Sequence, residues 1–139
     1  MKTTLLSKNS GQTKKIAAAF AKNKTRVWAL KGNLGSGKTT FAQGFIKALG
    51  IKTRVLSPTF IIFRVYPLSG GRKLYHVDLY RIAHAKELKP IGFAAILKNP
   101  QNILLIEWAE KIKKMIPPKA AWVTFTPQSR KDEVLITVE

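Results

Sequence analysis

The sequence predicts an α/β fold with a mainly parallel central sheet, helices on both faces and an added antiparallel hairpin. An apolar run at residues 27–30 is followed by a glycine-rich turn and then by an amphipathic segment at 40–49. A second apolar run at 102–106 has the length and composition of a buried strand. Strands that alternate with helices in this way pack as a parallel sheet covered by helices.

The first part of the chain supplies two strand–helix pairs. Residues 3–6 are expected to form a short strand, and Ser10 or Asn9 to cap a helix that runs to about Asn23. Residues 26–30 are the buried strand that leads into the glycine-rich turn. In the helix that follows, apolar side chains at 41, 42, 45, 46 and 49 share one face, and Gly50 ends the helix.

The second part adds antiparallel strands. Residues 55–56 begin a strand that the Ser-Pro-Thr-Phe segment at 57–60 interrupts, where Pro58 stiffens the turn that presents Thr59. The β-rich runs 60–66 and 73–80 flank a Ser-Gly-Gly-Arg turn at 69–72, which is typical of a hairpin. Short helices and loops are expected at 81–97, a helical turn at 109–115, and a closing strand pair at 122–126 and 133–138. Because there is no internal repeat or linker, residues 1–139 are expected to form one domain.

The composition excludes several classes of protein. The chain has no cysteine, which excludes disulfides, zinc–thiolate sites and thiol catalysis. The first eleven residues lack the pattern of a signal peptide, and no apolar run approaches membrane-spanning length. We therefore expect a cytoplasmic protein with no membrane partner.

The net charge is unusual. The chain has 25 Lys and Arg against 7 Asp and Glu, a formal charge of +18. Such an excess attracts polyanions, tRNA included, through a salt-dependent term that does not depend on sequence. The basic residues are scattered along the chain and are not gathered with aromatic residues, as a nucleic-acid platform requires. The charge therefore predicts nonspecific affinity for RNA more than specific recognition.

Residues 32–39 read Gly-Asn-Leu-Gly-Ser-Gly-Lys-Thr, the pattern of a phosphate-binding loop (P-loop) between a strand and a helix. The glycines let successive backbone N–H groups turn toward phosphate oxygens, and the helix N-terminus faces the same anion. Lys38 is placed to reach the β- and γ-phosphates, and the Thr39 hydroxyl to bind Mg²⁺. The alternative is a glycine turn that binds nothing. All four fixed positions are filled and the flanks fit, so the pattern favours a nucleoside triphosphate site.

Two of the seven acidic residues lie where such a site needs them. Glu107 ends the apolar strand at 102–106 and is suited to complete the Mg²⁺ shell, directly or through water. Asp78 lies within an apolar strand, where it either pairs with Arg81 or His76 or faces the nucleotide to orient the attacking water. We favour the nucleotide side. His76 by itself is more typical of a structural strand histidine, as Trp108 is of packing.

Four motifs occur in a fixed order along the chain. They are Gly-Asn-Leu-Gly-Ser-Gly-Lys-Thr-Thr-Phe (32–41), Ser-Pro-Thr-Phe (57–60) with Tyr66 six residues later, Tyr-His-Val-Asp-Leu-Tyr-Arg (75–81) and Leu-Ile-Glu-Trp (105–108). Together they closely resemble the TsaE family, small bacterial ATPases needed to make the threonylcarbamoyladenosine modification of tRNA. The resemblance runs from roughly residue 13 to residue 110, and the last three motifs are far more specific than the P-loop alone.

The resemblance implies a compact P-loop sheet, slow Mg²⁺-dependent ATP hydrolysis, and action on the TsaD–TsaB heterodimer that transfers the threonylcarbamoyl group. Hydrolysis then resets that complex between turnovers, and this chain does not perform the transfer. By the same resemblance, Asp78 supports hydrolysis together with Lys38, and Thr39 and Glu107 hold Mg²⁺. The implied nucleotide-binding residues are Thr13, Gly35, Ser36, Gly37, Lys38, Thr39, Thr40, the switch-like Thr59 and, by a looser match, Arg130.

The chain departs from the family pattern at several positions. Asn33 replaces the usual Asp and Ser36 the usual Ala, and Ala109 stands where proline is common. A Phe-Ala-Ala segment at 93–95 replaces what is often acidic sequence. Together with the charge of +18, these departures bear on the partner surface more than on the nucleotide site. The basic surface either contacts tRNA directly or matches an unusually acidic partner.

Three other functions are compatible with parts of the sequence. A small P-loop kinase needs a substrate domain and an arginine-bearing lid, for which 139 residues leave little space. A GTPase-like switch needs an Asn-Lys-x-Asp segment, and Asn23-Lys24 is followed by Thr25-Arg26. A basic RNA-binding protein with a vestigial nucleotide site is the third. All three rank below an accessory ATPase of tRNA modification.

Overall fold

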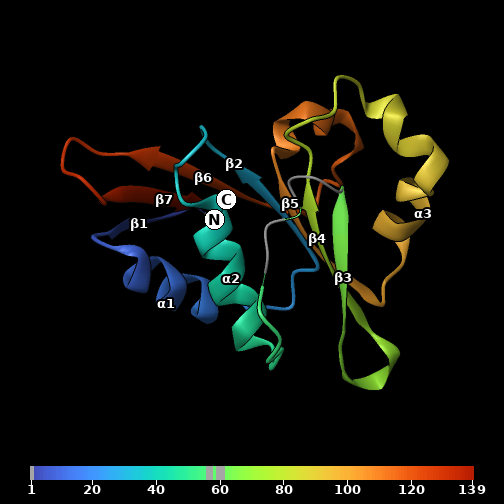
Figure 1. Cartoon of the computed structure of the whole chain (residues 1–139), viewed down its shortest axis with the longest axis horizontal. Coiled ribbons are helices and arrows are strands. Elements are labelled where there is room, and N and C mark those ends of the chain that lie inside the picture. The colour runs from blue at the N-terminus through green and yellow to red at the C-terminus, as the bar shows by residue number, and fades with distance from the viewer. Residues whose placement is uncertain (1, 56–57, 59–61) are drawn as a thin grey trace.

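In the computed structural model, which describes residues 2–55, 58 and 62–139, the described strands form one seven-stranded sheet (Figure 1). The strand order across the sheet is β1-β7-β6-β2-β5-β4-β3. The strands are β1 (Thr3–Ser7), β2 (Val27–Lys31), β3 (Phe63–Pro67), β4 (Lys73–Asp78), β5 (Asn102–Glu107), β6 (Ala121–Pro127) and β7 (Val134–Val138). The helices are α1 (Ser10–Phe20), α2 (Lys38–Ala48) and α3 (Phe93–Lys98), with 3₁₀ segments η1 (Ser69–Gly71), η2 (Ala85–Ile91) and η3 (Ala109–Met115).

The centre of the sheet is parallel and its edges are antiparallel. β2 pairs in parallel with β5 and β6, and β5 pairs in parallel with β4. At one edge β3 and β4 form the predicted hairpin, in which Phe63 faces Val77 and Pro67 faces Lys73. At the other edge β7 is antiparallel to both β6 and β1. The prediction of a mainly parallel sheet with an added antiparallel hairpin is confirmed.

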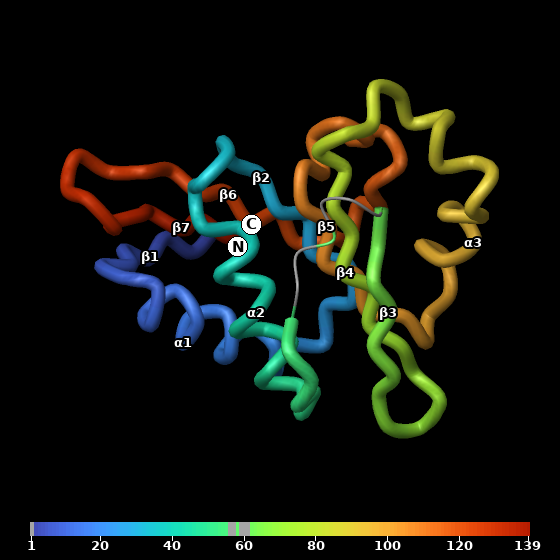
Figure 2. Tube along the Cα trace, in the orientation of Figure 1, coloured from blue at the N-terminus to red at the C-terminus, as the bar shows by residue number. Residues whose placement is uncertain are grey.

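Helices cover both faces of the sheet, as predicted. Alternate residues of β2 serve two separate cores: Trp28 and Leu30 pack beneath α1 and α2, whereas Val27 and Ala29 pack on the side of η2, α3 and η3. The tube in Figure 2 shows α1 and α2 close together, with α3 at the far end of the molecule. Because every residue of β2 except Lys31 is buried, this strand fixes the position of the loop that follows it.

Helices α1 and α2 touch through a glycine. A Cβ atom on Gly44 would lie 2.6 Å from both the Cα and the carbonyl oxygen of Lys14, so only glycine permits this approach of the two backbones. The contact holds the middle of α1 against the middle of α2. Asn9 caps α1 by accepting from the Gln12 amide at 2.9 Å, one of the two capping residues expected.

Some boundaries differ from the prediction. Helix α1 ends at Phe20 and not near Asn23, because the amides of Lys22 and Asn23 bond to carbonyls three residues earlier. Strand β4 ends at Asp78 and not at residue 80, because the Asp78 carboxylate accepts from the Tyr80 amide and closes a turn. Val55 lies in no strand. Residues 57 and 59–61 lie outside the described residues. They include Thr59, all of the predicted interruption at 57–60 except Pro58, and the first two residues of the predicted 60–66 strand.

Candidate active site

The loop between β2 and α2 has the geometry that the glycine motif predicts. Gly35 and Gly37 have φ of 77° and 106°, in the region that side chains disfavour. At Gly32 a Cβ would lie 2.6 Å from the Ser36 hydroxyl, so the loop closes tightly on itself. Gly37 precedes α2 without any side-chain cap, which leaves the first amides of the helix available to an anion.

Lys38 is the buried cation of this loop. Lys38 is only 4% exposed. Its ammonium donates to the carbonyls of Gly32 at 2.5 Å and Asn33 at 2.9 Å. An ammonium has three N–H donors, so two hold the loop and one is left for a ligand. Burial lowers the pKa of Lys38 from its usual 10.5, and nearby carboxylates, chiefly that of Glu107, oppose this.

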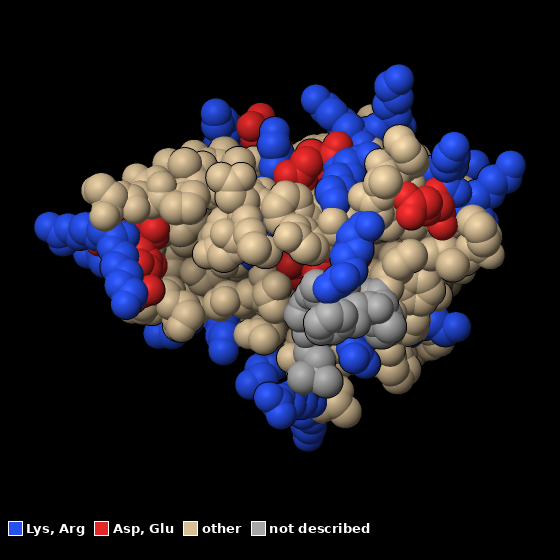
Figure 3. Space-filling view, turned by 45° about the horizontal axis from the view of Figure 1, so that its top comes forward, with Lys and Arg blue, Asp and Glu red and all other residues tan. Residues whose placement is uncertain are grey.

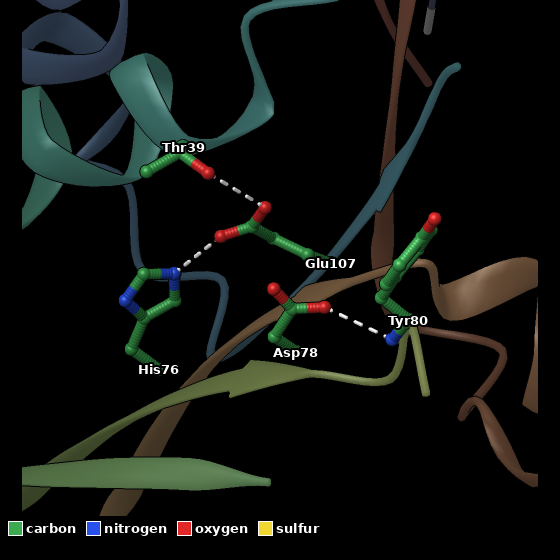
Figure 4. Close-up of polar contacts among 5 residues, drawn as sticks. All are labelled: Thr39, His76, Asp78, Tyr80 and Glu107. Atoms are coloured by element: carbon green, nitrogen blue, oxygen red, sulfur yellow. Dashed lines mark hydrogen bonds and ion pairs between the residues drawn. The ribbon is translucent and has the colours of Figure 1, made fainter. Parts of the chain in front are cut away.

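A buried chain of hydrogen bonds links the start of α2 to two strands (Figure 4). The Thr39 hydroxyl donates to Oε1 of Glu107 at 3.0 Å, and Oε2 of Glu107 lies 2.6 Å from Nε2 of His76. His76 is 0% exposed and Glu107 2%. The carboxylate of Glu107 is therefore held from both sides, with one oxygen aimed at the predicted metal-binding hydroxyl.

Asp78 lies beside Glu107 because their strands are parallel and in register. The β4–β5 pairing places Asp78 opposite Glu107 at the carboxyl end of the sheet, next to the P-loop. Asp78 is 7% exposed, and its Oδ1 accepts from the Tyr80 amide at 2.9 Å (Figure 4). The sheet therefore brings together two carboxylates that are 29 positions apart in the chain.

Trp108 covers the ammonium of Lys38. The residue has φ of 60°, a left-handed conformation that costs a non-glycine residue about 1 kcal/mol or more. This turn places its ring 4.1 Å from the Lys38 nitrogen, measured to the ring centroid, and 5.3 Å from the ring of Tyr80. Strain next to a buried lysine and two carboxylates is typical of a functional site.

Two hollows meet at the glycine loop. One, of 350 Å³, lies between the start of α1, the loop and the β6–β7 turn. The predicted residues that line it are Thr13, Gly35, Ser36, Gly37, Thr40 and Arg130. The other, of 260 Å³, lies between the loop and the ends of β4 and β5. The predicted residues that line it are Gly35, Ser36, Gly37, Lys38, Thr39, Thr40, Asp78 and Glu107. Thr59 lies outside the described residues.

The loop, the buried cation and the paired carboxylates are the groups that a P-loop site requires. The family model "Threonylcarbamoyl adenosine biosynthesis protein TsaE" matches residues 7–134. The chain belongs to the TsaE family.

Individual TsaE proteins agree with this assignment. The TsaE protein of Bacillus subtilis is 43% identical over 112 residues, which cover 78% of this chain and 68% of that protein. The TsaE protein of Rickettsia felis is 38% identical over 117 residues, 82% of this chain and 67% of that one. Both are named as tRNA threonylcarbamoyladenosine biosynthesis proteins. The crystal structure of YdiB from B. subtilis superposes with a TM-score of 0.75 at 31% identity, covering 99% of this chain and 84% of YdiB, so the P-loop fold is shared.

The donors present in this TsaE chain suit Mg²⁺. Mg²⁺ prefers oxygen ligands, keeps several waters and is commonly held by one or two protein groups together with phosphates. The Thr39 hydroxyl and the Glu107 carboxylate are such a pair, 3.0 Å apart. In the part of the chain that the structure describes, no three His, Cys, Asp or Glu residues gather as a metal cluster. The two oxygen donors therefore fit a metal that shares its shell with a nucleotide.

Sequence reasoning set aside two residues that the TsaE site includes. His76 holds Glu107, and Trp108 covers Lys38. The even spacing of His76 and Asp78 along one strand was the available signal for His76, because it places both on one face. The partner of His76 lies on another strand, so spacing within one strand could not identify it.

Among the described residues no helix is long and apolar enough to cross a bilayer.

Proposed function

We propose that this TsaE chain is a Mg²⁺-dependent ATPase required for the threonylcarbamoyladenosine modification of tRNA. In this proposal it binds the TsaD–TsaB heterodimer and resets that complex between turnovers, and it does not perform the transfer. The observation that supports it most directly is the Thr39–Glu107 hydrogen bond at the start of α2, beside the buried ammonium of Lys38. A hydroxyl, a carboxylate and a lysine at a helix N-terminus are the groups that P-loop ATPases use.

The phosphates would lie in the 260 Å³ hollow, because it is the one lined by Lys38, Asp78 and Glu107. The nucleoside would lie in the 350 Å³ hollow. Backbone amides from Gly35 to Thr40 and the remaining N–H of Lys38 bind phosphate oxygens. Thr13 and Arg130 line the nucleoside end. Thr39 and Glu107 would hold Mg²⁺, which supplies positive charge to the β- and γ-phosphates.

Asp78 supports hydrolysis by orienting water toward the γ-phosphorus. As the water oxygen bonds to phosphorus, the bond to the bridging oxygen of ADP breaks, and the water proton passes to solvent or to the departing phosphate. The turn that binds the Tyr80 amide to Oδ1 of Asp78 keeps the carboxylate at the end of β4. Asp78 is a positioning group for the water in this scheme, since the developing charge is stabilised by Lys38 and the loop.

Phosphate release by variants tests the ATPase assignment. Lys38→Ala and Glu107→Gln are expected to reduce Mg²⁺-dependent release at least tenfold, since each removes a group that contacts phosphate or metal. Glu139→Gln, the same change at the exposed residue after β7, is the matched control and should release phosphate at the wild-type rate. Equal rates in Glu107→Gln and Glu139→Gln would exclude Glu107 from the site.

Reconstitution tests the role in tRNA modification. Hydrolysis is measured for the chain alone, with the TsaD–TsaB pair, and then with tRNA. A low rate that changes when the pair is added, together with repeated rounds of tRNA modification, supports the proposal. A rate that is unchanged by the pair but changes with tRNA or a metabolite supports an RNA-binding protein or a kinase instead. Phosphate found on a metabolite would identify the kinase.

A further inference from the structure

Two hollows that are not part of the nucleotide site lie at the amino-terminal ends of the central strands, opposite the P-loop. They lie where β2, β5 and β6 begin, and have volumes of 460 and 410 Å³. Arg26 and Pro117 line both of them. We call them the basal hollows. The first is completed by Ala94, Leu97, Lys98 and Met115, and the second by residues 23–25, Val27, Lys119 and Ala120. In Figure 2 the chain can be followed from α3 into the start of β5.

The first basal hollow has an aliphatic floor. Leu97 is 5% exposed and packs into the core, while Ala94 on the same helix is exposed. Met115 is half-buried and has the flexible side chain that adapts to varied apolar partners. Among the described residues, neither hollow is lined by an aromatic side chain. Since single-stranded RNA is bound mainly by stacking on aromatic rings, the lining suits an aliphatic side chain of a protein more than a base.

The rim of the basal hollows is cationic. Lys24, Arg26, Lys98 and Lys119 line them, and in the described part of the chain no Asp or Glu does. Glu139 pairs with Trp122 near the start of β6, so a carboxylate lies along the same edge of the sheet without lining either hollow. In the face shown in Figure 3, Lys and Arg lie mainly around the outline, with acidic groups beside some of them. The first basal hollow combines cations with an aliphatic floor, and the second continues the cationic rim.

Arg26 is held in place at the wall between the two hollows. Its Nη1 donates to the carbonyls of Asn99 and Asn102, each at 2.9 Å. A guanidinium has five N–H donors, so donors remain for a ligand carboxylate. Because the fork is already fixed by the protein, less side-chain entropy is lost when it binds a planar anion.

We propose that the basal hollows dock an acidic segment of a protein partner. An aliphatic side chain of that segment enters the hollow between Ala94 and Met115, and a flanking carboxylate binds Arg26. The excess of 25 basic over 7 acidic residues gives the charge complementarity that draws such a segment to this chain. The surface is separate from the P-loop, which lies at the opposite ends of the same strands, so the proposal does not depend on ATP hydrolysis.

Two neighbouring alanines of α3 provide a matched test. Ala94 lines the first basal hollow, whereas Ala95 is also exposed but lines neither basal hollow. Ala94→Glu and Ala95→Glu add the same charge to the same helix, so they change long-range attraction equally and differ only in blocking the hollow. The probe is a short fluorescent peptide of glutamates around a central leucine pair, with an all-glutamate peptide and a single-stranded RNA of equal charge for comparison.

The leucine peptide is expected to bind the wild-type chain and to bind Ala94→Glu about tenfold more weakly, a difference of one decade in Kd. Ala95→Glu should bind within about twofold of wild type, and amide chemical shifts should change at residues 94–98, 115–116 and 119–120. Equal binding by the two variants, equal binding of the all-glutamate peptide, or no binding of the leucine peptide would overturn the proposal. RNA binding that Ala94→Glu alone weakens would assign the hollows to nucleic acid and overturn it as well.

Discussion

Replacing His76 with alanine is expected to destabilise the protein, because it removes one of the two hydrogen-bond partners of the buried Glu107 carboxylate. His76 is 0% exposed and Glu107 2%, and the bond between them is 2.6 Å long. Leaving a buried carboxylate without one of its hydrogen-bond partners costs about 1.5–3 kcal/mol. A domain of this size has a total stability of about 5–15 kcal/mol, so the variant should fold but be much easier to unfold.

A double-mutant cycle separates this coupling from the loss of the imidazole itself. Glu107→Gln removes the charge that loses its imidazole partner in His76→Ala. The destabilisation of the double variant should therefore be smaller than the sum of the two single destabilisations by about 1–3 kcal/mol. Urea unfolding without Mg²⁺ or nucleotide measures all four free energies of unfolding. His84, the other histidine, is exposed, and His84→Ala combined with Glu107→Gln should be additive within about 0.5 kcal/mol. Additivity in the His76 cycle too would refute the role of His76 in holding Glu107.

Three further changes test packing, an unpartnered hydroxyl and a charged cap, each by urea unfolding. Gly44→Ala should lower stability by about 1–2 kcal/mol, because a clash 2.6 Å from the Lys14 backbone outweighs the helix propensity gained. Lys47→Ala, at an exposed position on the same helix, should change stability by less than about 0.5 kcal/mol. A Gly44→Ala variant more stable than wild type would contradict the close approach of the two helices. The buried hydroxyl of Ser36 has no hydrogen-bond partner among the described residues, so Ser36→Ala should leave stability unchanged or raise it by up to about 1 kcal/mol, and a marked loss would reveal a partner. Two backbone N–H bonds at the start of η2 lower the pKa of Glu87 from its usual 4.5, so the stability that wild type has over Glu87→Gln should be present at pH 7 and vanish as pH falls below 4.5 through the lowered pKa; a difference independent of pH would show that charge is not the cause.

The parts of the fold that depend on neighbouring residues could be predicted from the sequence. The strand at 27–30, the glycine loop and the helix after it follow from local composition, and the structure places them within two residues of the prediction. The hairpin around Gly70 and Gly71 follows in the same way, since both glycines take positive φ. The place of β1 beside β7 could not be predicted, because pairing between the two ends of the chain leaves no local pattern.

The same distinction applies to the candidate site. Lys38 and Thr39 lie in one motif, and Glu107 and Asp78 each end a recognisable strand. What joins them is the register of β4 with β5, and only that register reveals that His76 meets Glu107. Trp108 covers Lys38 because of one left-handed residue after β5, a conformation that propensities do not favour for tryptophan.

Calorimetric titration of ATP in the presence of Mg²⁺ tests the central claim most directly, which is that the P-loop binds the nucleotide through Lys38. Wild type and Lys47→Ala, whose lysine is exposed near the other end of α2, are expected to bind ATP equally. Lys38→Ala should bind more than about tenfold more weakly while unfolding cooperatively in urea, because it loses the cation that contacts the phosphates. ATP affinity in a folded Lys38→Ala variant equal to that of Lys47→Ala would contradict the assignment of the nucleotide site.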